Sequence, residues 1–521
     1  MATIRNPVLR GFHPDPALCT VGDDCYLATS TCEWFPGIAL HHSRDLVHWR
    51  PCGSAFSARF QVDLRGVPDS GGLWAPDLSW CEGRFWLTTA LVRTRHWPMM
   101  DAVCLVSTAP TIAGPWSEPV PLAWWGWDPA LFHDEDGRSW FLSMLLDPRP
   151  GRDHMAGVVL APFDRARCAL AGEPQLIYRG SGAGAVEGPR LYRHQGWYYL
   201  VVAEGGTKWQ HRATVARSRR IEGPYETDPA GPLVTSRGHP AHPLQKAGHA
   251  SLARLSDGSW WLACLCARPL ADGSCVFGRE TALAPIAWVE GWPRLATGGV
   301  LLPPRVPAPN LPPAPWHGPL DDALPGILPA GFLSLRDAPD PQWYAWDGAV
   351  LALRGRDPPT SCHEQSVIAR RLSELPTRCS LRLDYQPTSP DEMAGLLVRY
   401  DSNEQLALLV SGDGAGGRCL RLTRLDAGQW SEPEFAPAPA AGPLRLAVEV
   451  AAEGISWSWA AGDGPWQAIG GRFPLAPYGD DYREQWRFTG AVIGCAAYDR
   501  HRRQRWARFG ELRWEEADQG A

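Results

Sequence analysis

The sequence predicts an all-β protein in which a five-bladed β-propeller precedes a β-sandwich of the concanavalin or jelly-roll type. A motif recurs five times between residues 6 and 300: a polar residue leads into a strand, and a turn then leads into an aromatic-rich strand. The polar residues of the five copies are Asp15, Asp77, Asp128, Glu187 and His249. Their spacings of 62, 51, 59 and 62 residues are typical of propeller blades with several strands each. A proline-rich segment ends the repeat, and strand patterns without a repeat follow it.

Each repeat also contains a second strand that carries large aromatic residues. These strands are expected at residues 25–27, 85–87, 140–142, 198–200 and 260–262. Asp-Gly pairs at residues 136–137 and 257–258 separate strand-like runs and favour tight hairpins. Because five copies that close into a ring leave no free sheet edge, closure is favoured over an open array.

Residues 301–318 contain so many prolines that neither a helix nor a central strand fits them. We predict a semi-rigid connector there, between a propeller over residues 1–300 and a sandwich over residues 319–521. In the second part, apolar and polar residues alternate at 349–354, 379–384, 395–400, 405–410 and 444–449. This alternation predicts half-buried antiparallel strands. The sandwich either supports the propeller by packing or binds sugar itself.

The composition narrows the class of protein. With 521 residues and a net charge of −6, the chain is expected to form more than one globular domain, without a nucleic-acid or membrane surface. The first repeat begins without a preceding apolar leader, and the 14 cysteines form no regular framework. We therefore expect free thiols, no zinc site and a cytoplasmic location. The 27 tryptophans fill the space between sheets or, in part, form platforms for sugar rings.

Asp15, Asp128 and Glu187 are the candidate catalytic residues. The innermost strands of a propeller converge on its axis, so residues at the same position of each repeat face a central pocket. Glycoside hydrolysis needs one protonated carboxyl to assist the leaving oxygen and one ionised carboxylate to activate water or attack carbon. A third carboxylate raises the pKa of the acid by like-charge repulsion. Calcium binding is the competing interpretation, but the sequence has no dense Asp-x-Asp-x-Asp loop, and we predict no metal ligands.

These motifs resemble glycoside hydrolase family 43, and within it the β-xylosidases that carry an appended C-terminal sandwich domain. The most specific are Gly-Phe-His-Pro-Asp-Pro at residues 11–16, Trp-Ala-Pro at 74–76 and Glu-Gly-Pro at 187–189. Similar stretches cover almost the whole chain, at residues 6–9, 28–31, 33–37, 41–46, 64–72, 128–134, 203–207, 245–249, 278–281, 365–371 and 488–491.

The resemblance implies an inverting exo-glycosidase that removes terminal β-1,4-linked xylose from the non-reducing end of xylo-oligosaccharides. Asp15 matches the general base of the family, Glu187 the general acid, and Asp128 the carboxylate that tunes and orients the acid. The resemblance implies no required cofactor, and it is compatible with a divalent cation such as calcium near His249. It is also compatible with a homodimer or a homotetramer.

Further residues match the substrate site of the family. Arg279 matches an arginine that holds substrate hydroxyls, Trp74 an aromatic wall, and His249 a residue that supports the pocket floor. Phe488 matches an aromatic residue that reaches over from the sandwich and closes the site, with Trp486 as the alternative in a shifted register. The second domain is thus expected to contribute to the rim of the active site.

Cys32 and Phe35 belong to a motif that lines the sugar subsite in the family. Cys32 stands where relatives carry phenylalanine, and residues 208–211 also depart from the usual pattern. The smaller cysteine implies a wider pocket, so an α-L-arabinofuranosidase, or an enzyme with both activities, is the first alternative to a β-xylosidase. A carbohydrate-binding protein without catalysis is the alternative from another class, and the presence of all three carboxylates argues against it.

Overall fold

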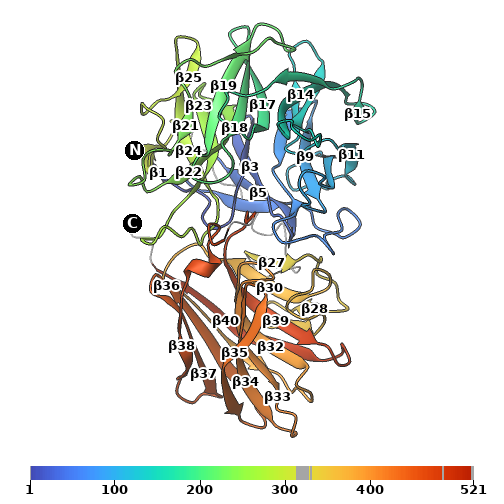
Figure 1. Cartoon of the computed structure of the whole chain (residues 1–521), viewed down its shortest axis with the longest axis vertical. Helices are drawn as coiled ribbons and strands as arrows, with labels where there is room; N and C mark the ends of the chain where they lie inside the picture. Colours follow the sequence, from blue (N-terminus) through green and yellow to red (C-terminus); the bar gives the residue numbers. More distant parts are fainter. Residues whose placement is uncertain (1, 312–327, 329–330, 484–485, 518–521) are drawn as a thin grey trace.

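The computed structural model describes residues 2–311, 328, 331–483 and 486–517, and it confirms the all-β class. Two domains lie one above the other along the longest axis of the molecule (Figure 1). Within the described residues the single helical element is η1 (Ala476–Tyr478), a short 3-10 helix. No helix in that part of the chain has the length and apolarity to cross a bilayer.

The upper domain consists of five antiparallel sheets, which are the predicted blades. Blade one contains β2 (Ala17–Val21), β3 (Asp24–Thr29), β5 (Gly37–Ser43) and β6 (Arg50–Phe56). Blade two contains β7 (Gly72–Leu73), β8 (Asp77–Cys81), β9 (Arg84–Val92), β10 (Ala102–Ala109) and β11 (Val120–Ala123). Blade three contains β12 (Ala130–His133), β13 (Ser139–Leu146), β14 (Met155–Asp164), β15 (Ala169–Leu170) and β16 (Gln175–Tyr178).

The last two blades have the same order of strands. Blade four contains β17 (Glu187–His194), β18 (Trp197–Glu204), β19 (Arg212–Ser218), β20 (Glu226–Thr227) and β21 (Val234–Thr235). Blade five contains β22 (Gln245–Arg254), β23 (Trp260–Ala267), β24 (Glu280–Val289) and β25 (Trp292–Leu295). The innermost strands β2, β8, β12, β17 and β22 contact one another in a closed ring. The predicted aromatic strands are β3, β9, β13, β18 and β23, each paired with an innermost strand.

The beginning of the chain closes the ring against blade five. β1 (Thr3–Arg5) pairs with β26 (Arg305–Pro307), which lies inside the predicted proline-rich connector. The Asn6 amide donates to the carbonyls of Leu283 (2.7 Å) and Pro303 (2.8 Å). These bonds fix the chain just before the segment that carries Asp15. Residues 312–318 of the predicted connector lie outside the described residues.

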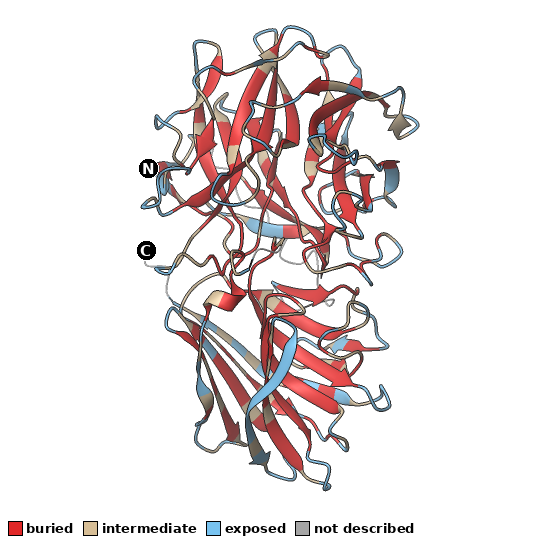
Figure 2. Ribbon diagram, in the orientation of Figure 1, coloured by how far each residue is buried: buried red, intermediate tan, exposed pale blue. Residues whose placement is uncertain are grey.

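The lower domain is a sandwich of an eight-stranded and a seven-stranded sheet. The first sheet has the order β35 (Gln429–Ala438), β34 (Arg418–Asp426), β33 (Gln405–Gly412), β32 (Glu392–Arg399), β39 (Val492–Asp499), β30 (Ser366–Arg371), β27 (Phe332–Leu335) and β4 (Trp34–Phe35). The second has the order β28 (Tyr344–Trp346), β29 (Leu351–Arg354), β40 (Trp506–Glu516), β31 (Thr377–Asp384), β36 (Leu444–Ala451), β37 (Gly454–Ala461) and β38 (Gln467–Phe473). Figure 2 shows buried strands in both domains and the exposed edge strand β35.

The two domains share a strand. β4 belongs to the propeller in sequence, but it pairs with β27 of the sandwich, with Trp34 opposite Leu335 and Phe35 opposite Ser334. Trp34 is buried in a cluster of sandwich side chains that includes Leu333. The alternation patterns of the sequence contain no signal for this exchange of a strand between domains.

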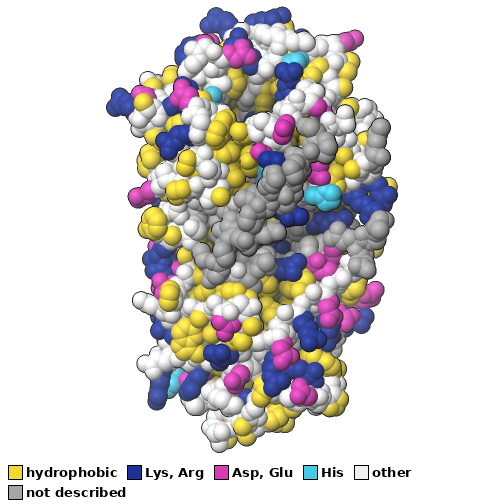
Figure 3. All heavy atoms as spheres, turned by 180° about the vertical axis from the view of Figure 1, so that it is seen from behind, with side chains coloured by type: hydrophobic (Ala, Val, Ile, Leu, Met, Phe, Trp, Pro, Cys, Tyr) yellow, Lys and Arg dark blue, Asp and Glu magenta, His cyan; other side chains and the backbone are white. Residues whose placement is uncertain are grey.

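Buried ion pairs also join the domains. Lys246 of β22 is fully buried, and its ammonium lies 2.7 Å from Asp480 and 2.6 Å from Asp481 in the sandwich. Asp69 of the propeller contacts Arg336 at 2.7 Å and Arg399 at 3.2 Å. Breaking such a pair leaves a buried charge uncompensated, which is strongly destabilising. On the outside, basic and acidic side chains intermix over both domains in the view from behind (Figure 3).

Candidate active site

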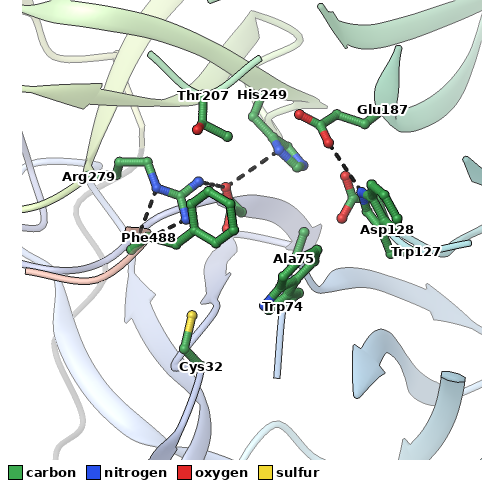
Figure 4. A pocket seen from close by; sticks show the side chains of 11 residues that line it. Cys32, Trp74, Ala75, Trp127, Asp128, Glu187, Thr207, His249, Arg279 and Phe488 are labelled. Atoms are coloured by element: carbon green, nitrogen blue, oxygen red, sulfur yellow. Dashed lines mark hydrogen bonds and ion pairs between the residues drawn. The ribbon is translucent and has the colours of Figure 1, made fainter. Parts of the chain in front are cut away.

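A pocket between the propeller axis and the sandwich brings most of the predicted site residues together (Figure 4). It holds about 370 Å³ of empty space including its mouth, at the small end of the range for ligand pockets. The lining residues are Asp15, Cys32, Trp74, Ala75, Trp127, Asp128, Glu187, Thr207, His249, Arg279 and Phe488. Figure 4 shows Glu187, Trp127 and Asp128 on one side, and Arg279 with Phe488 on the other.

An unusual backbone conformation places four of these residues, one of which is Cys32 with a φ angle of 51°. Asp15, Asp128 and His249 have φ angles of 57°, 54° and 49°, in the left-handed region that few residues other than glycine occupy. Asp15 and Asp128 also precede prolines, which favour extended backbone in the residue before them. Such strained residues persist only where the surrounding structure holds them in place, and they cluster at functional sites. Next to Glu187, the left-handed residue is Gly188, with φ 57°.

Asp15 is held as a carboxylate. Its Oδ1 accepts a hydrogen bond from Nη1 of Arg279 (2.8 Å) and lies 3.4 Å from Nδ1 of His249, while its Oδ2 accepts from the Ser30 hydroxyl (2.5 Å). Burial acts to raise the pKa of Asp15, but Arg279, His249 and Ser30 outweigh it and hold that pKa below its ordinary value. Burial lowers the pKa of His249 to about 3, so the imidazole is neutral. Asp15 therefore has the charge that a general base requires.

Glu187 and Asp128 form a pair that retains a proton. Burial is the main cause that raises the pKa of Glu187 to about 7, with the Asp15 charge adding to it and a hydrogen bond from Trp127 opposing it. Burial, then Glu187 and Asp15, raise the pKa of Asp128 well above its ordinary value. Oδ2 of Asp128 accepts from the backbone N–H of Gly188 (2.9 Å), which ties it to the residue after Glu187. The pocket thus contains an ionised and a protonated carboxyl at neutral pH.

This arrangement predicts the pH dependence of catalysis. Asp15 must be ionised, and since its pKa is lowered, it stays ionised above about pH 4. Glu187 must be protonated, and its pKa of about 7 means that the active form is lost as the pH rises past that value. We expect kcat/KM to be level between about pH 4 and 7 and then to fall about tenfold per pH unit. Initial rates on an aryl glycoside from pH 4 to 9 test this expectation, which a flat profile up to pH 9 contradicts.

Aromatic rings form the apolar walls. Trp74 packs edge-to-face against Phe488 (5.4 Å between centroids) and against Trp127 (5.6 Å). Ser70 connects two of these walls, because its carbonyl accepts from the Trp74 indole (2.9 Å) and its hydroxyl accepts from the Phe488 backbone N–H (3.0 Å). The Phe488 carbonyl in turn accepts from Arg279 (3.2 Å). The sandwich therefore completes the pocket, and its contribution to the lining comes from Phe488 rather than from Trp486.

Two residues named from the sequence lie elsewhere. Phe35 is corrected: it is in strand β4, and its side chain is buried in the core cluster of blades one and two, with Leu73 and Phe56. The turn of the chain into the sandwich sheet takes this residue away from the sugar subsite. Asp77 accepts from Arg190 (3.1 Å) and from the backbone N–H of Leu131 (3.2 Å), and it joins blades two, three and four without lining the pocket.

Sequence reasoning missed three lining residues, Ala75, Trp127 and Thr207. Ala75 and Thr207 lie inside motifs that were recognised, but neither has a side chain that signals chemistry. Trp127 directly precedes Asp128, and its indole N–H donates to Oε2 of Glu187 (3.1 Å). Among 27 tryptophans, nothing in the local pattern distinguishes one that contacts a carboxyl.

A propeller pocket with one ionised and one protonated carboxyl, closed by an appended sandwich, defines a glycoside hydrolase. The family model for glycosyl hydrolases family 43 matches residues 4–293. A second model, the beta xylosidase C-terminal concanavalin A-like domain, matches residues 325–515. The chain belongs to glycoside hydrolase family 43, whose members generally need no cofactor for hydrolysis.

Full-length relatives support this assignment. The chain is 35% identical to a xylan 1,3-beta-xylosidase of Vibrio sp over 97% of this chain and 98% of the relative. It superposes on the crystal structure of a xylan beta-1,4-xylosidase from Bacillus halodurans C-125 with a TM-score of 0.95, at 41% identity over 98% of this chain and 100% of the other. It is also 35% identical to a non-reducing end alpha-L-arabinofuranosidase of Bacteroides ovatus over 78% of this chain and 76% of that protein.

Proposed function

We propose that the protein is an inverting exo-β-xylosidase that releases single xylose residues from the non-reducing end of β-1,4-xylo-oligosaccharides. The observation that carries the proposal is the opposite pKa shifts of Asp15 (lowered) and Glu187 (raised) in one small pocket with aromatic walls. Phe488 closes the pocket beside Trp74, which favours a terminal sugar over the interior of a chain. The relatives named as β-xylosidases support xylose as that sugar.

The reaction follows from the charges of the two residues. Asp15 takes a proton from a water molecule, and the water oxygen attacks the anomeric carbon. Glu187 gives its proton to the glycosidic oxygen as the bond to the leaving sugar breaks. The Arg279 charge and the Ser30 hydroxyl keep Asp15 ionised until the water is activated. One such displacement inverts the configuration, so a β-xyloside yields α-xylose first.

An α-L-arabinofuranosidase activity is the second candidate, alone or together with the first. Cys32 lines the pocket at a position where the family that the sequence resembles carries phenylalanine. The smaller cysteine side chain leaves space for a differently shaped pentose. The similarity to an arabinofuranosidase of Bacteroides ovatus points the same way. The linkage also needs a test, because the Vibrio relative is named for 1,3-linked xylan.

A substrate panel tests the proposal. We expect p-nitrophenyl β-xyloside and β-1,4-xylobiose to give a kcat/KM at least about tenfold above p-nitrophenyl α-L-arabinofuranoside and β-1,3-xylobiose, since specificity of one to three kcal/mol is usual for small changes of sugar shape. NMR of the fresh product should show α-xylose. Initial β-xylose overturns the inverting mechanism, and a dominant arabinofuranoside rate overturns the assignment of substrate.

We also propose that hydrolysis runs without a bound calcium ion and that the protein works in the cytoplasm. Nε2 of His249 is buried without a hydrogen-bond partner among the described residues, but it faces Gly188 rather than the several oxygen ligands that calcium prefers. The one group of described residues with metal-ligand spacing, Cys275, Asp480 and Asp481, has the Lys246 ammonium against its two carboxylates. The same panel run with EDTA should give unchanged rates. All 14 cysteines are free, which supports a reducing compartment.

A further inference from the structure

We propose that Trp127 is a positioning residue for acid catalysis: its indole N–H determines which oxygen of Glu187 carries the proton and thereby sets how strongly the rate depends on the leaving group. The inference rests on the proposed role of Glu187 as the general acid. It assigns a chemical role to a residue that would otherwise be an aromatic wall of the sugar pocket.

The geometry fixes the indole against Glu187. Nε1 of Trp127 lies 3.1 Å from Oε2 of Glu187, and the tryptophan is 3% exposed. Its ring packs edge-to-face against Trp74, with 5.6 Å between centroids and 81° between planes. Its carbonyl accepts from the backbone N–H of Met144 (3.0 Å). Held on both the ring and the backbone, the indole cannot turn its N–H away from the carboxyl without disturbing the core.

The chemistry of an indole makes this contact directional. A tryptophan N–H can donate a hydrogen bond but cannot accept one. Oε2 accepts this hydrogen bond in both protonation states of Glu187, and because a carbonyl oxygen accepts better than a hydroxyl oxygen, the contact favours the acidic proton on Oε1. No hydrogen bond joins Oε1 to a side chain or backbone group of the described residues, so this oxygen is available to the substrate. Trp127 thus selects the oxygen that donates to the leaving group.

The same hydrogen bond adjusts the strength of the acid. A donor to a carboxylate is held more tightly than a donor to a neutral carboxyl, so the contact favours ionisation and opposes the effect of burial on the pKa of Glu187. Without it, Glu187 would be a weaker acid with its proton free to move between two oxygens. Substrates with poor leaving groups need the proton most, so they should be the most sensitive to Trp127.

Trp127→Phe is the decisive variant, because it keeps an aromatic ring in the wall and removes the donor. Kinetics are measured on aryl β-xylosides whose leaving groups range from 2,4-dinitrophenol to phenol. We expect kcat/KM to fall about tenfold on the phenyl substrate and to stay within about twofold on the dinitrophenyl substrate, which leaves without a proton. The alkaline limb of the pH profile should move up by about one pH unit, the size expected for a lost hydrogen bond to a charged group.

Trp97→Phe is the matched control. Trp97 packs on Trp127 (6.3 Å between centroids) and is 42% exposed, and none of the hydrogen bonds of the described residues joins it to a carboxylate. This variant should leave both the leaving-group dependence and the pH profile as in the unaltered protein. If Trp127→Phe folds poorly, benzothienylalanine at position 127 keeps the shape of tryptophan and lacks only the N–H.

The outcomes separate this inference from the proposed function. An equal loss on all leaving groups, with an unmoved alkaline limb, means that Trp127 is only a wall and overturns the inference. Unchanged kinetics overturn it as well. If Glu187→Gln loses the same fraction of its activity on every leaving group, Glu187 is not the general acid. The proposed function then fails at that residue, whatever the result at Trp127.

Discussion

Asp15→Ala is expected to lower kcat on β-xylosides by about 10³-fold, while the protein stays folded. The carboxylate is the base that takes a proton from water, and general-base catalysis contributes about 10²–10⁴-fold. The substitution also leaves Arg279 without its 2.8 Å partner, so some loss of stability is expected. Steady-state kinetics measure the effect, and a thermal unfolding transition of normal cooperativity shows that the fold survives.

A small anion distinguishes the loss of the base from general damage. Azide needs no deprotonation and fits the space vacated by the Asp15 side chain. With an aryl β-xyloside that has a good leaving group, azide should restore turnover of Asp15→Ala and give the α-xylosyl azide. A β-xylosyl azide would place the nucleophile on the wrong face, and near-normal hydrolysis without azide would remove Asp15 from the mechanism.

Glu187→Gln is expected to lower kcat/KM on xylobiose and phenyl β-xyloside by about 10³-fold, because the amide cannot protonate the leaving oxygen. With 2,4-dinitrophenyl β-xyloside the loss should be about tenfold or less, since that leaving group departs as an anion. The alkaline fall above pH 7, which the raised pKa of Glu187 predicts, should disappear from the pH profile. Rates on this series of substrates at several pH values measure both effects.

Glu204→Gln provides a matched control for this change. Glu204 is a buried glutamate of β18 in the same blade, but it accepts from Ser181 and Thr214 and does not line the pocket. Its substitution should reduce stability and leave the dependence on the leaving group intact. If Glu187→Gln loses activity equally on all leaving groups, Glu187 is not the proton donor.

The sequence predicted the parts of the fold that depend on repetition. The five copies of one motif correspond to five innermost strands, and equal positions in the copies place Asp15, Asp128, Glu187 and His249 at one pocket. Asp77 occupies the same position of its repeat but pairs with Arg190. A repeat predicts that residues converge, but the rotamer and partner of each side chain decide whether it reaches the pocket.

The features of the fold and the site that the sequence did not predict depend on contacts between segments far apart in the chain. The pairing of β4 with β27 joins residues about 300 positions apart. Because of this pairing, the Phe35 side chain lies in a hydrophobic core and not in the predicted sugar pocket. The Trp127 contact with Glu187 spans 60 residues and depends on how two blades pack. Composition and spacing do not determine such contacts, whereas the carboxylates were predictable because each stands in a recurring motif.

The shared strand has a consequence for how substrate is consumed. With β4 built into the sandwich sheet and the Lys246 pairs buried between the domains, the sandwich is held against the propeller and Phe488 stays in the wall of the pocket. In an exo-acting enzyme the terminal sugar binds in this small pocket, so after each cleavage the released sugar lies deeper than the remaining oligosaccharide. The shortened chain must leave before the monosaccharide can escape, so successive cleavages of one chain require fresh encounters. The enzyme should therefore shorten all chains of a mixture together, and intermediates of every length should accumulate.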